Sequence, residues 1–313
     1  MGGRRLSGWR PGLAGCLLCL LPPVARAEPA AAPPETITWF VQAMPPHFSY
    51  PAGRPPTTPA ELGNGELDGL LRLLIGQMPS KIKHEFVEAG LARFELMARE
   101  GKAICSILHV RTDARRQWLY FTHLMPPPVT RDIHVVVRRE RLGEFQLGGQ
   151  TLRLQDLLQR HDIALLLPRG RAYGPAVDAV LRQQGQPGPH TVVLAQTTQL
   201  LSMLRAGRMD YTLEYPLVVD AFQRSSPPAR QGEELVALPV VEGRSTQLAT
   251  AACSRSPAGR RAIEVLDAAV RSLAEDPQRE VLLRDWLGPQ FEGERERILH
   301  YLDQRAKSGP QIE

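Results

Sequence analysis

The sequence has 313 residues, of which 43% are hydrophobic and 23% are charged, so a fibrous or disordered chain is excluded and two core-forming units are expected rather than one. The formal net charge of +5 comes mostly from the first 27 residues, which hold four arginines and no acid. The remainder carries 34 basic and 33 acidic residues, and this near neutrality excludes global charge as an argument for a nucleic-acid or membrane partner.

Residues 1–27 have the layout of a secretory signal peptide. A basic start precedes a short apolar run at 12–24, and residues 25–27 form an A-x-A cleavage site. The run is shorter than the roughly 20 residues that a spanning helix needs. Cys16 also completes a lipoprotein-like box, but most of the apolar run follows it. We therefore predict cleavage after Ala27 and a soluble protein in the periplasm.

The first half of the mature chain alternates strands and helices after a flexible leader at 28–35. Period-two alternation with β-branched and aromatic residues predicts strands, and apolar residues at helical spacing predict helices. The predicted strands are 36–43, 83–89 and 102–108, the predicted helices are 66–78 and 92–101, and prolines make 44–59 a loop. This order is typical of a parallel sheet covered by helices.

The second half contains another α/β unit, which a long strand at 132–140 introduces. Strands are predicted at 162–168, 190–196, 209–215, 236–243 and 247–254, with helices at 151–161, 170–184, 197–207, 258–277 and 277–287. The tail from Lys307 is polar and is predicted to be loose. The plan is two α/β lobes, and the closing helices are too few to form a third core alone.

Motifs for catalysis and for metal or cofactor binding are missing from the mature chain. Residues 63–69 (GNGELDG) approach a phosphate loop, but the spacing is one residue off and a proline-rich loop precedes it, so we predict a turn that starts a helix. The histidines are scattered singly, which predicts no metal site. Cys105 and His109 lie four residues apart without an orienting acid, so no nucleophile and base are assembled. We expect no cofactor.

Three arginines follow the buried strand 102–108. Arg111, Arg115 and Arg116 surround Asp113 at the point where the chain leaves the carboxyl end of the sheet, which is where open α/β sheets bind ligands. An arginine there can hold a carboxylate with its planar fork of donors. The alternative is that all three are solvated or paired with neighbouring acids. Position alone leaves both interpretations open.

Two cysteines remain after cleavage, Cys105 and Cys253. Export into an oxidising compartment favours a single disulfide. Each cysteine also lies in an apolar strand, where it can be a small buried residue with a free thiol. Both alternatives stay open.

Several segments together resemble the bacterial extracellular solute-binding proteins of family 3, the polar-amino-acid type of periplasmic binding protein. The pattern T-x-x-R followed by Q-W-x-x-F-T at 112–122 is similar to a motif of that family. Residues 44–50 (MPPHFSY) resemble its Y-P-P-F loop, and 204–215 (LRAGRMDYTLEY) resemble its L-x-x-G-R-x-D-A segment. Residues 253–288, with Trp286, are similar to its closing segment. The resemblance runs from about Ile37 to Leu287.

This resemblance implies a two-lobed, type II periplasmic-binding-protein-like fold. Each lobe would be a mixed α/β sheet flanked by helices, and two crossing strands would join the lobes. Residues 36–127 with 249–313 would form lobe 1, and 128–248 would form lobe 2. The hinge would lie near 125–131 and 247–251. Both cysteines would then belong to lobe 1.

The resemblance also implies a ligand site in the cleft. The arginine of T-x-x-R, here Arg115, would bind the α-carboxylate of an amino acid, and Phe48 or Met44 would cover the ligand side chain. The second lobe would contribute the loop at 169–173. The full set of predicted ligand-binding residues is Gln42, Met44, Phe48, His109, Arg115, Arg171, Tyr173, Glu214 and Tyr215.

The sequence departs from the family where the amino group of the ligand would bind. The family places a carboxylate five residues after the Asp of G-R-x-D. Five residues after Asp210 stands Tyr215, and Glu214 is one position short. The hydroxyl residues that usually precede T-x-x-R are replaced at 108–110 by Leu, His and Val. We therefore expect a cleft that keeps its anion-binding arginine, with the amino-group half of the site not evident.

The leading hypothesis is a non-enzymatic, monomeric solute-binding protein that captures a small carboxylate-bearing solute by hinge closure and serves an ABC-transporter permease. The second hypothesis keeps the fold and assigns a sensory or partner-docking role, with a membrane sensor as the partner. The third is an α/β hydrolytic enzyme, which has the least support because no nucleophile–base set is visible.

Overall fold

The computed structural model describes residues 1–3, 34–126, 131–145, 151–183, 190–244 and 248–313. The chain from Ala32 to Glu313 forms one compact unit. Residues 4–27 of the predicted signal peptide, with its cleavage site at Ala27, lie outside the described residues, as do most of the leader and parts of both predicted hinges. Among the described residues, none of the helices combines the length and the hydrophobicity that crossing a membrane requires.

The first sheet has five strands in the order β2-β1-β3-β10-β4. Its strands are β1 (Thr36–Val41), β2 (Lys83–Glu88), β3 (Ile104–Ser106), β4 (Leu119–His123) and β10 (Thr250–Ser254). The first three run parallel, as the alternating order predicts, and β10 runs antiparallel to both of its neighbours. Strand β4 directly follows the arginine segment and is not among the predicted strands.

The second sheet also has five strands, in the order β7-β6-β8-β5-β9. Its strands are β5 (His134–Arg138), β6 (Leu165–Pro168), β7 (His190–Val193), β8 (Tyr211–Glu214) and β9 (Leu235–Pro239). Strand β6 is parallel to β7 and β8, whereas β5 is antiparallel to β8 and β9. Both sheets are therefore mixed, which matches the predicted fold class.

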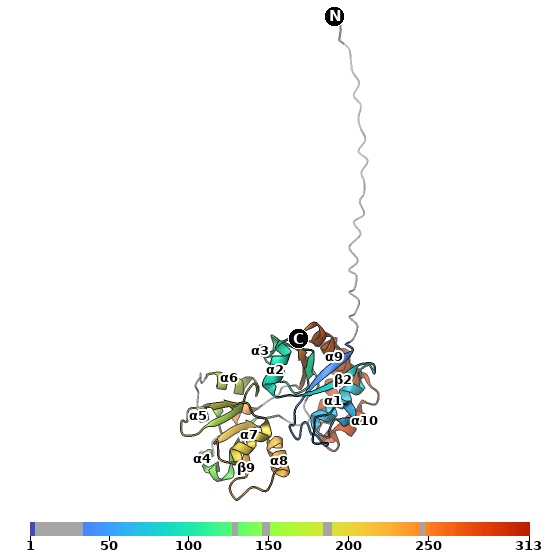
Figure 1. Cartoon of the computed structure of the whole chain (residues 1–313). Helices are drawn as coiled ribbons and strands as arrows, with labels where there is room; N and C mark the ends of the chain where they lie inside the picture. The colour runs from blue at the N-terminus through green and yellow to red at the C-terminus, as the bar shows by residue number, and fades with distance from the viewer. Residues whose placement is uncertain (4–33, 127–130, 146–150, 184–189, 245–247) are drawn as a thin grey trace. The chain divides into compact units, whose positions relative to one another are not determined.

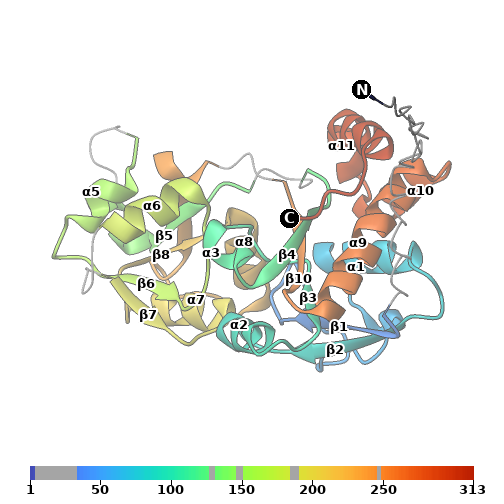
Figure 2. The same ribbon diagram turned by 90° about the horizontal axis from the view of Figure 1, so that it is seen from above.

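Helices flank both sheets (Figures 1 and 2). Those beside the first sheet are α1 (Glu66–Gly76), α2 (Leu91–Arg99), α3 (Asp113–Arg116), α9 (Pro257–Glu275), α10 (Arg279–Leu287) and α11 (Gln290–Lys307). Those beside the second sheet are α4 (Leu142–Phe145), α5 (Leu154–Leu158), α6 (Pro175–Gln183), α7 (Thr197–Arg205) and α8 (Pro216–Ser225). Single 3-10 turns occur at η1 (Pro59–Glu61), η2 (Arg139–Arg141) and η3 (Val241–Gly243). Helices α4, α8 and α11 were not predicted.

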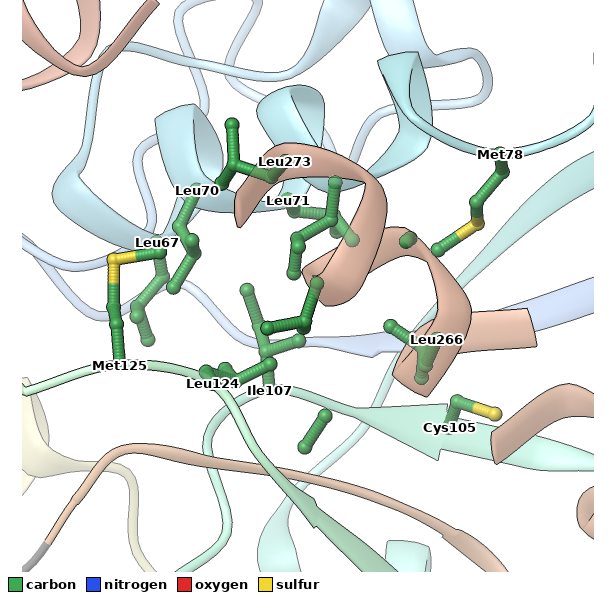
Figure 3. Packing of buried hydrophobic residues seen from close by; sticks show 14 of the residues in the cluster. Leu67, Leu70, Leu71, Met78, Cys105, Ile107, Leu124, Met125, Leu266 and Leu273 are labelled. Atoms are coloured by element: carbon green, nitrogen blue, oxygen red, sulfur yellow. The ribbon is translucent and has the colours of Figure 1, made fainter. Parts of the chain in front are cut away.

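The largest core lies between the first sheet and helices α1 and α9. Leu70 and Leu71 of α1 and Leu266 and Leu273 of α9 belong to one buried cluster, part of which Figure 3 shows. Leucines three or four positions apart lie on one face of a helix, so both helices bury a continuous apolar stripe. Helix α9 begins after Ser256, whose hydroxyl accepts from the third amide of the helix. The closing helices thus pack against the lobe that the chain forms first.

A disulfide joins Cys105 of β3 to Cys253 of β10. The two residues are opposite each other in the antiparallel pair, and both are buried. The sequence left open a disulfide or two buried free thiols, and the structure contains the disulfide. It links the strand that precedes the arginine segment to the strand with which the chain returns to the first sheet.

The prediction of a loose tail from Lys307 was wrong. The backbones of Glu313 and Phe121 exchange two hydrogen bonds of 3.1 and 3.0 Å, so the tail adds a short pairing to the edge strand β4. Buried Asp267 of α9 accepts the amide of Gln311 at 3.0 Å and forms an ion pair with Arg305 of α11. The sequence of the tail is polar, but these partners lie far away in the chain and could not be read from it.

The ion pair between Arg305 and Asp267 predicts a strong dependence of stability on Arg305. Each of the two residues is only 1% exposed, so Arg305→Ala removes the buried cation of Asp267 and leaves only the more exposed Arg271, 3.3 Å from its Oδ2. We expect a loss of about 3 kcal/mol in the free energy of unfolding, measured by urea denaturation. Arg295→Ala on the same helix is the control, because its pair with Glu280 is exposed and should contribute about 1 kcal/mol at most. Equal, small losses in the two variants would contradict the buried anchor.

Candidate functional site

A cavity of about 470 Å³ is lined by loops and strand ends from both sheets. Its volume is that of sites for small molecules. Five arginines line it and, among the described residues, no aspartate or glutamate does. The five are Arg93, Arg115, Arg131, Arg169 and Arg171.

Arg115 is held in the cavity by the short helix α3. The hydroxyl of Thr112 caps this helix by accepting the amide of Arg115 at 3.2 Å. The guanidinium donates through Nη1 to the carbonyl of Val110 and through Nη2 to that of Gly170, both at 2.7 Å. These two bonds come from segments beside different sheets and fix the plane of the guanidinium.

Within the described chain, Arg115 has no carboxylate at ion-pair distance. Burial lowers the pKa of Arg115, and the more distant charges of Asp178 and Glu95 partly offset that effect. A guanidinium nevertheless keeps its charge in proteins, and two of its five N–H groups are used by the carbonyls. The remaining donors are available to an anion in the cavity.

The other two arginines of the segment do not line the cavity. Arg111 forms an ion pair with Glu313, and Arg116 lies 3.6 Å from the same carboxylate and 3.8 Å from Asp113. The alternative that the sequence left open therefore holds for these two arginines, and Arg115 differs from both.

Arg171, unlike Arg115, has a carboxylate partner. It forms a two-pronged ion pair with Glu214 at the end of β8. The side chains are 12% and 2% exposed. Burial acts to lower the pKa of Arg171, but the charge and the hydrogen bonds of Glu214 outweigh it and raise the pKa. The guanidinium also lies over the rings of Tyr173 and Tyr215, at 5.0 and 5.5 Å from their centroids.

Tyr173 carries a hydroxyl without a hydrogen-bond partner in the described chain, although that oxygen is buried. The loop before α6 holds the residue, since Asp178 accepts the amides of Tyr173 and Gly174. Burial raises the pKa of Tyr173, so the phenol stays protonated and can donate. The residue lines the cavity, and its hydroxyl is a buried donor without a partner in the described chain.

His109 lies in the wall beside Arg115 and is 4% exposed. Its Nδ1 is 2.8 Å from the hydroxyl of Ser106, and its ring packs on Phe94 with centroids 4.1 Å apart. Burial, with a smaller contribution from the charge of Arg115, holds the pKa of His109 well below its usual value. The imidazole is therefore neutral near pH 7.

A second charged cluster, which the sequence did not reveal, joins the first loop to the start of β5. Arg131 forms an ion pair with Glu66 and lies 3.1 Å from Nε2 of buried His47. Burial raises the pKa of Glu66, but the hydrogen bond from His47 and the charge of Arg131 prevail and lower it to about 2. Gly65 allows the chain before α1 to lie directly against the backbone of His47, because a Cβ at position 65 would lie 2.2 Å from the carbonyl oxygen of His47.

The structure brings together most of the predicted site residues. Seven of the nine line the cavity: Gln42, Met44, His109, Arg115, Arg171, Tyr173 and Tyr215. Phe48 does not, because a turn closed by the Met44–Phe48 bridge folds its ring into the core, where it is fully buried. Glu214 does not line the cavity either, because Arg171 stands between it and the open space.

Some lining residues were not predicted, among them Arg93 and Arg131. Arg131 follows a proline cluster and Arg93 lies on α2, and neither position carries a motif that could have identified it. Within the described ranges, no group of three or more His, Cys, Asp or Glu side chains is arranged to hold a metal ion.

No protein-family model matches the chain, and a comparison with curated proteins finds no match. Solved structures do match. An ancestral arginine-binding protein bound to arginine is 14% identical with a TM-score of 0.56, over 81% of this chain and 99% of that one. A histidine kinase sensor domain with similarity to periplasmic binding proteins is 17% identical, with a TM-score of 0.57, over 81% and 96%. A substrate-binding protein of an amino acid ABC transporter from Streptococcus pneumoniae, bound to L-arginine, is 14% identical, with a TM-score of 0.53, over 88% and 95%.

At these identities the likeness establishes the fold. The chain has the two-lobed, type II periplasmic-binding-protein-like fold, with a mixed sheet and flanking helices in each lobe. The fold class predicted from the sequence is confirmed.

The buried imidazole of His109 predicts a loss of stability on acidification. Below about pH 6.5 the unfolded chain binds a proton at His109 that the folded protein excludes, so stability falls as the pH drops from 6.5 toward the lower folded pKa. This residue contributes a slope of up to about 1.4 kcal/mol per pH unit. We expect His109→Gln to have a shallower decline of unfolding free energy between pH 7 and 5 than the wild type. Parallel curves for the two proteins would contradict the assignment.

Proposed function

We propose that the protein is a divergent solute-binding protein of the family 3 type that captures a small carboxylate-bearing solute between its two lobes. The observation that carries the proposal is a cavity lined by five arginines and, among the described residues, by no carboxylate. Such a lining gives a positive potential in a partly dehydrated space, which attracts and holds an anion.

Arg115 is the proposed carboxylate-binding group. Its guanidinium is positioned by two backbone carbonyls and has further donors free, so it can bind a carboxylate without first breaking an ion pair. Tyr173 supplies a second donor nearby, since the loop that contains Gly170 and Tyr173 is the loop that Arg115 contacts.

Contacts between segments of the two sheets support a closure mechanism. Arg115 bonds the carbonyl of Gly170, and Arg131 reaches His47 and Glu66. Bonds of this kind can form when the lobes close on a ligand and break when they open. The proposed boundaries are lobe 1 at 36–127 plus 249–313 and lobe 2 at 128–248.

A binding role without catalysis is favoured by the lack of an accessible nucleophile and base in the described chain. Ser106 and His109 lie 2.8 Å apart, but Ser106 is fully buried and does not line the cavity. Both described cysteines are joined in the disulfide. A hydrolase would need a nucleophile that faces its substrate.

Transport through an ABC permease and delivery in the periplasm complete the leading proposal, with support from the sequence layout of a signal peptide. A sensory role is the second candidate. It is favoured by the likeness to a histidine kinase sensor domain, which shares the fold at a similar TM-score.

The test begins with a thermal-shift screen of the mature protein against amino acids, peptides, dicarboxylates and aromatic acids. A ligand at 100 times its dissociation constant should stabilise the protein by about 2.7 kcal/mol. For each acid that binds, we expect Arg115→Ala to weaken binding by about 2–5 kcal/mol, measured by calorimetry, because a buried charge pair is lost.

Arg116→Ala is the matched control, since Arg116 is the adjacent residue and faces Glu313 instead of the cavity. It should leave the affinity for the same acid unchanged. Wild-type affinity in Arg115→Ala, or an equal loss in both variants, would refute the proposed site.

A further inference from the structure

The state of Glu214 deepens the proposed function and rests on it. We propose that the cavity selects carboxylates that lack an ammonium group. Arg171 already forms an ion pair with Glu214, which is the carboxylate that a ligand ammonium would need as its partner. The ligand class is an acid with an apolar body, held by Arg115 and by the hydroxyl of Tyr173. Free α-amino acids of the same carbon skeleton are disfavoured.

The first step concerns Glu214 itself. Its two carboxylate oxygens receive Nη1 and Nη2 of Arg171, and Oε1 also accepts the amide of Tyr215 at 2.8 Å. The side chain is 2% exposed and does not line the cavity. A ligand ammonium could reach this carboxylate only by displacing Arg171, which would leave a guanidinium buried without its partner.

The second step concerns the other groups that could compensate an ammonium. Glu66 is bound to Arg131 and His47. Asp178, whose charge acts on Arg115, does not line the cavity and accepts the amides of Tyr173 and Gly174. The lining histidines offer no negative charge, and Nδ1 of His109 is already bonded to Ser106. Neither acid is therefore free to balance a positive ligand group.

The third step concerns aromatic rings, whose faces can also hold an ammonium. Arginine guanidinium groups already lie over the rings of the two tyrosines in the wall, Tyr173 and Tyr215. Arg171 lies over Tyr173, and Arg171 and Arg131 lie over Tyr215 at 5.5 and 5.8 Å from its centroid. A ligand ammonium would meet guanidinium groups at these faces and would be repelled.

The fourth step concerns charge balance. Two of the five lining arginines are neutralised by Glu66 and Glu214, whereas no described acid forms an ion pair with Arg93, Arg115 or Arg169. The cavity thus keeps an excess of positive charge. An ammonium-free acid reduces this excess, but a zwitterion brings a compensating positive charge into it.

The fifth step concerns the body of the ligand. Beside the arginines, the wall is largely apolar, and the residues of this part include Met44, Leu67, Ile107, Leu108, Val110 and Leu248. Together with the unpaired hydroxyl of Tyr173, these residues suit an aliphatic or aromatic body close to a carboxylate or another oxygen acceptor.

The first experiment uses the wild-type protein and pairs of acids that differ only in the ammonium group. The pairs are 3-phenylpropionate with L-phenylalanine, 4-methylpentanoate with L-leucine, and glutarate with L-glutamate, each titrated by calorimetry. We expect the ammonium-free member of at least one pair to bind 100-fold or more tightly than its amino acid. Equal or tighter binding of an amino acid would overturn this inference and leave the proposed function standing. Binding of none of the six acids would overturn both.

The second experiment frees Glu214. In Arg171→Ala the carboxylate has no guanidinium partner, so the affinity for L-phenylalanine or L-leucine should rise at least tenfold relative to the wild type. The double variant Arg171→Ala/Glu214→Gln is the control, because glutamine keeps the volume of glutamate but has no negative charge to accept the ammonium. A gain of similar size in the double variant, or no gain in the single variant despite a wild-type circular dichroism spectrum, would contradict the inference.

The third experiment is Tyr173→Phe, which removes only a hydroxyl that has no protein partner. The melting temperature without ligand should stay unchanged, and the affinity for the ammonium-free acid should fall about tenfold. This variant also tests the inference if Arg171→Ala fails to fold. Unchanged affinity for that acid would remove Tyr173 from the site and overturn its proposed role.

Discussion

The guanidinium of Arg115, held between the carbonyls of Val110 and Gly170, is the interaction on which the account of the site depends. Burying a charged group costs free energy unless an opposite charge or hydrogen bonds compensate it. Here the backbone fixes the plane of the group and leaves its charge without an ion pair among the described residues. Strand β3, the cap at Thr112 and the contact with the second sheet's loop all serve to place it.

The contrast with Arg171 explains why two arginines in one wall have different roles. Arg171 is neutralised by Glu214 and lies against two tyrosine rings, so it contributes shape and a fixed local dipole. Arg115 has only neutral carbonyl partners, so its charge remains available to a ligand. The pair formed by Arg171 and Glu214 turns a wall that could have held a zwitterion into one suited to a simple anion.

Sequence patterns predicted the parts of the protein that depend on local periodicity. Most of the parallel strands, the flanking helices and the position of Arg115 after a buried strand could be read in this way. Phe48 could not be placed, because a turn decides whether its ring enters the core or the cavity. The partnership of Arg171 with Glu214 and the anchoring of Glu313 at β4 join residues far apart in the chain, and no local pattern encodes such pairings.

The most direct measurement of the central claim is a crystal structure of the protein with 3-phenylpropionate, solved beside the ligand-free form. The account predicts carboxylate oxygens within hydrogen-bonding distance of the Arg115 guanidinium, an oxygen near the hydroxyl of Tyr173, and an intact pair between Arg171 and Glu214. A carboxylate bound to Arg171 with Glu214 displaced, or an acid seated outside this cavity, would contradict it.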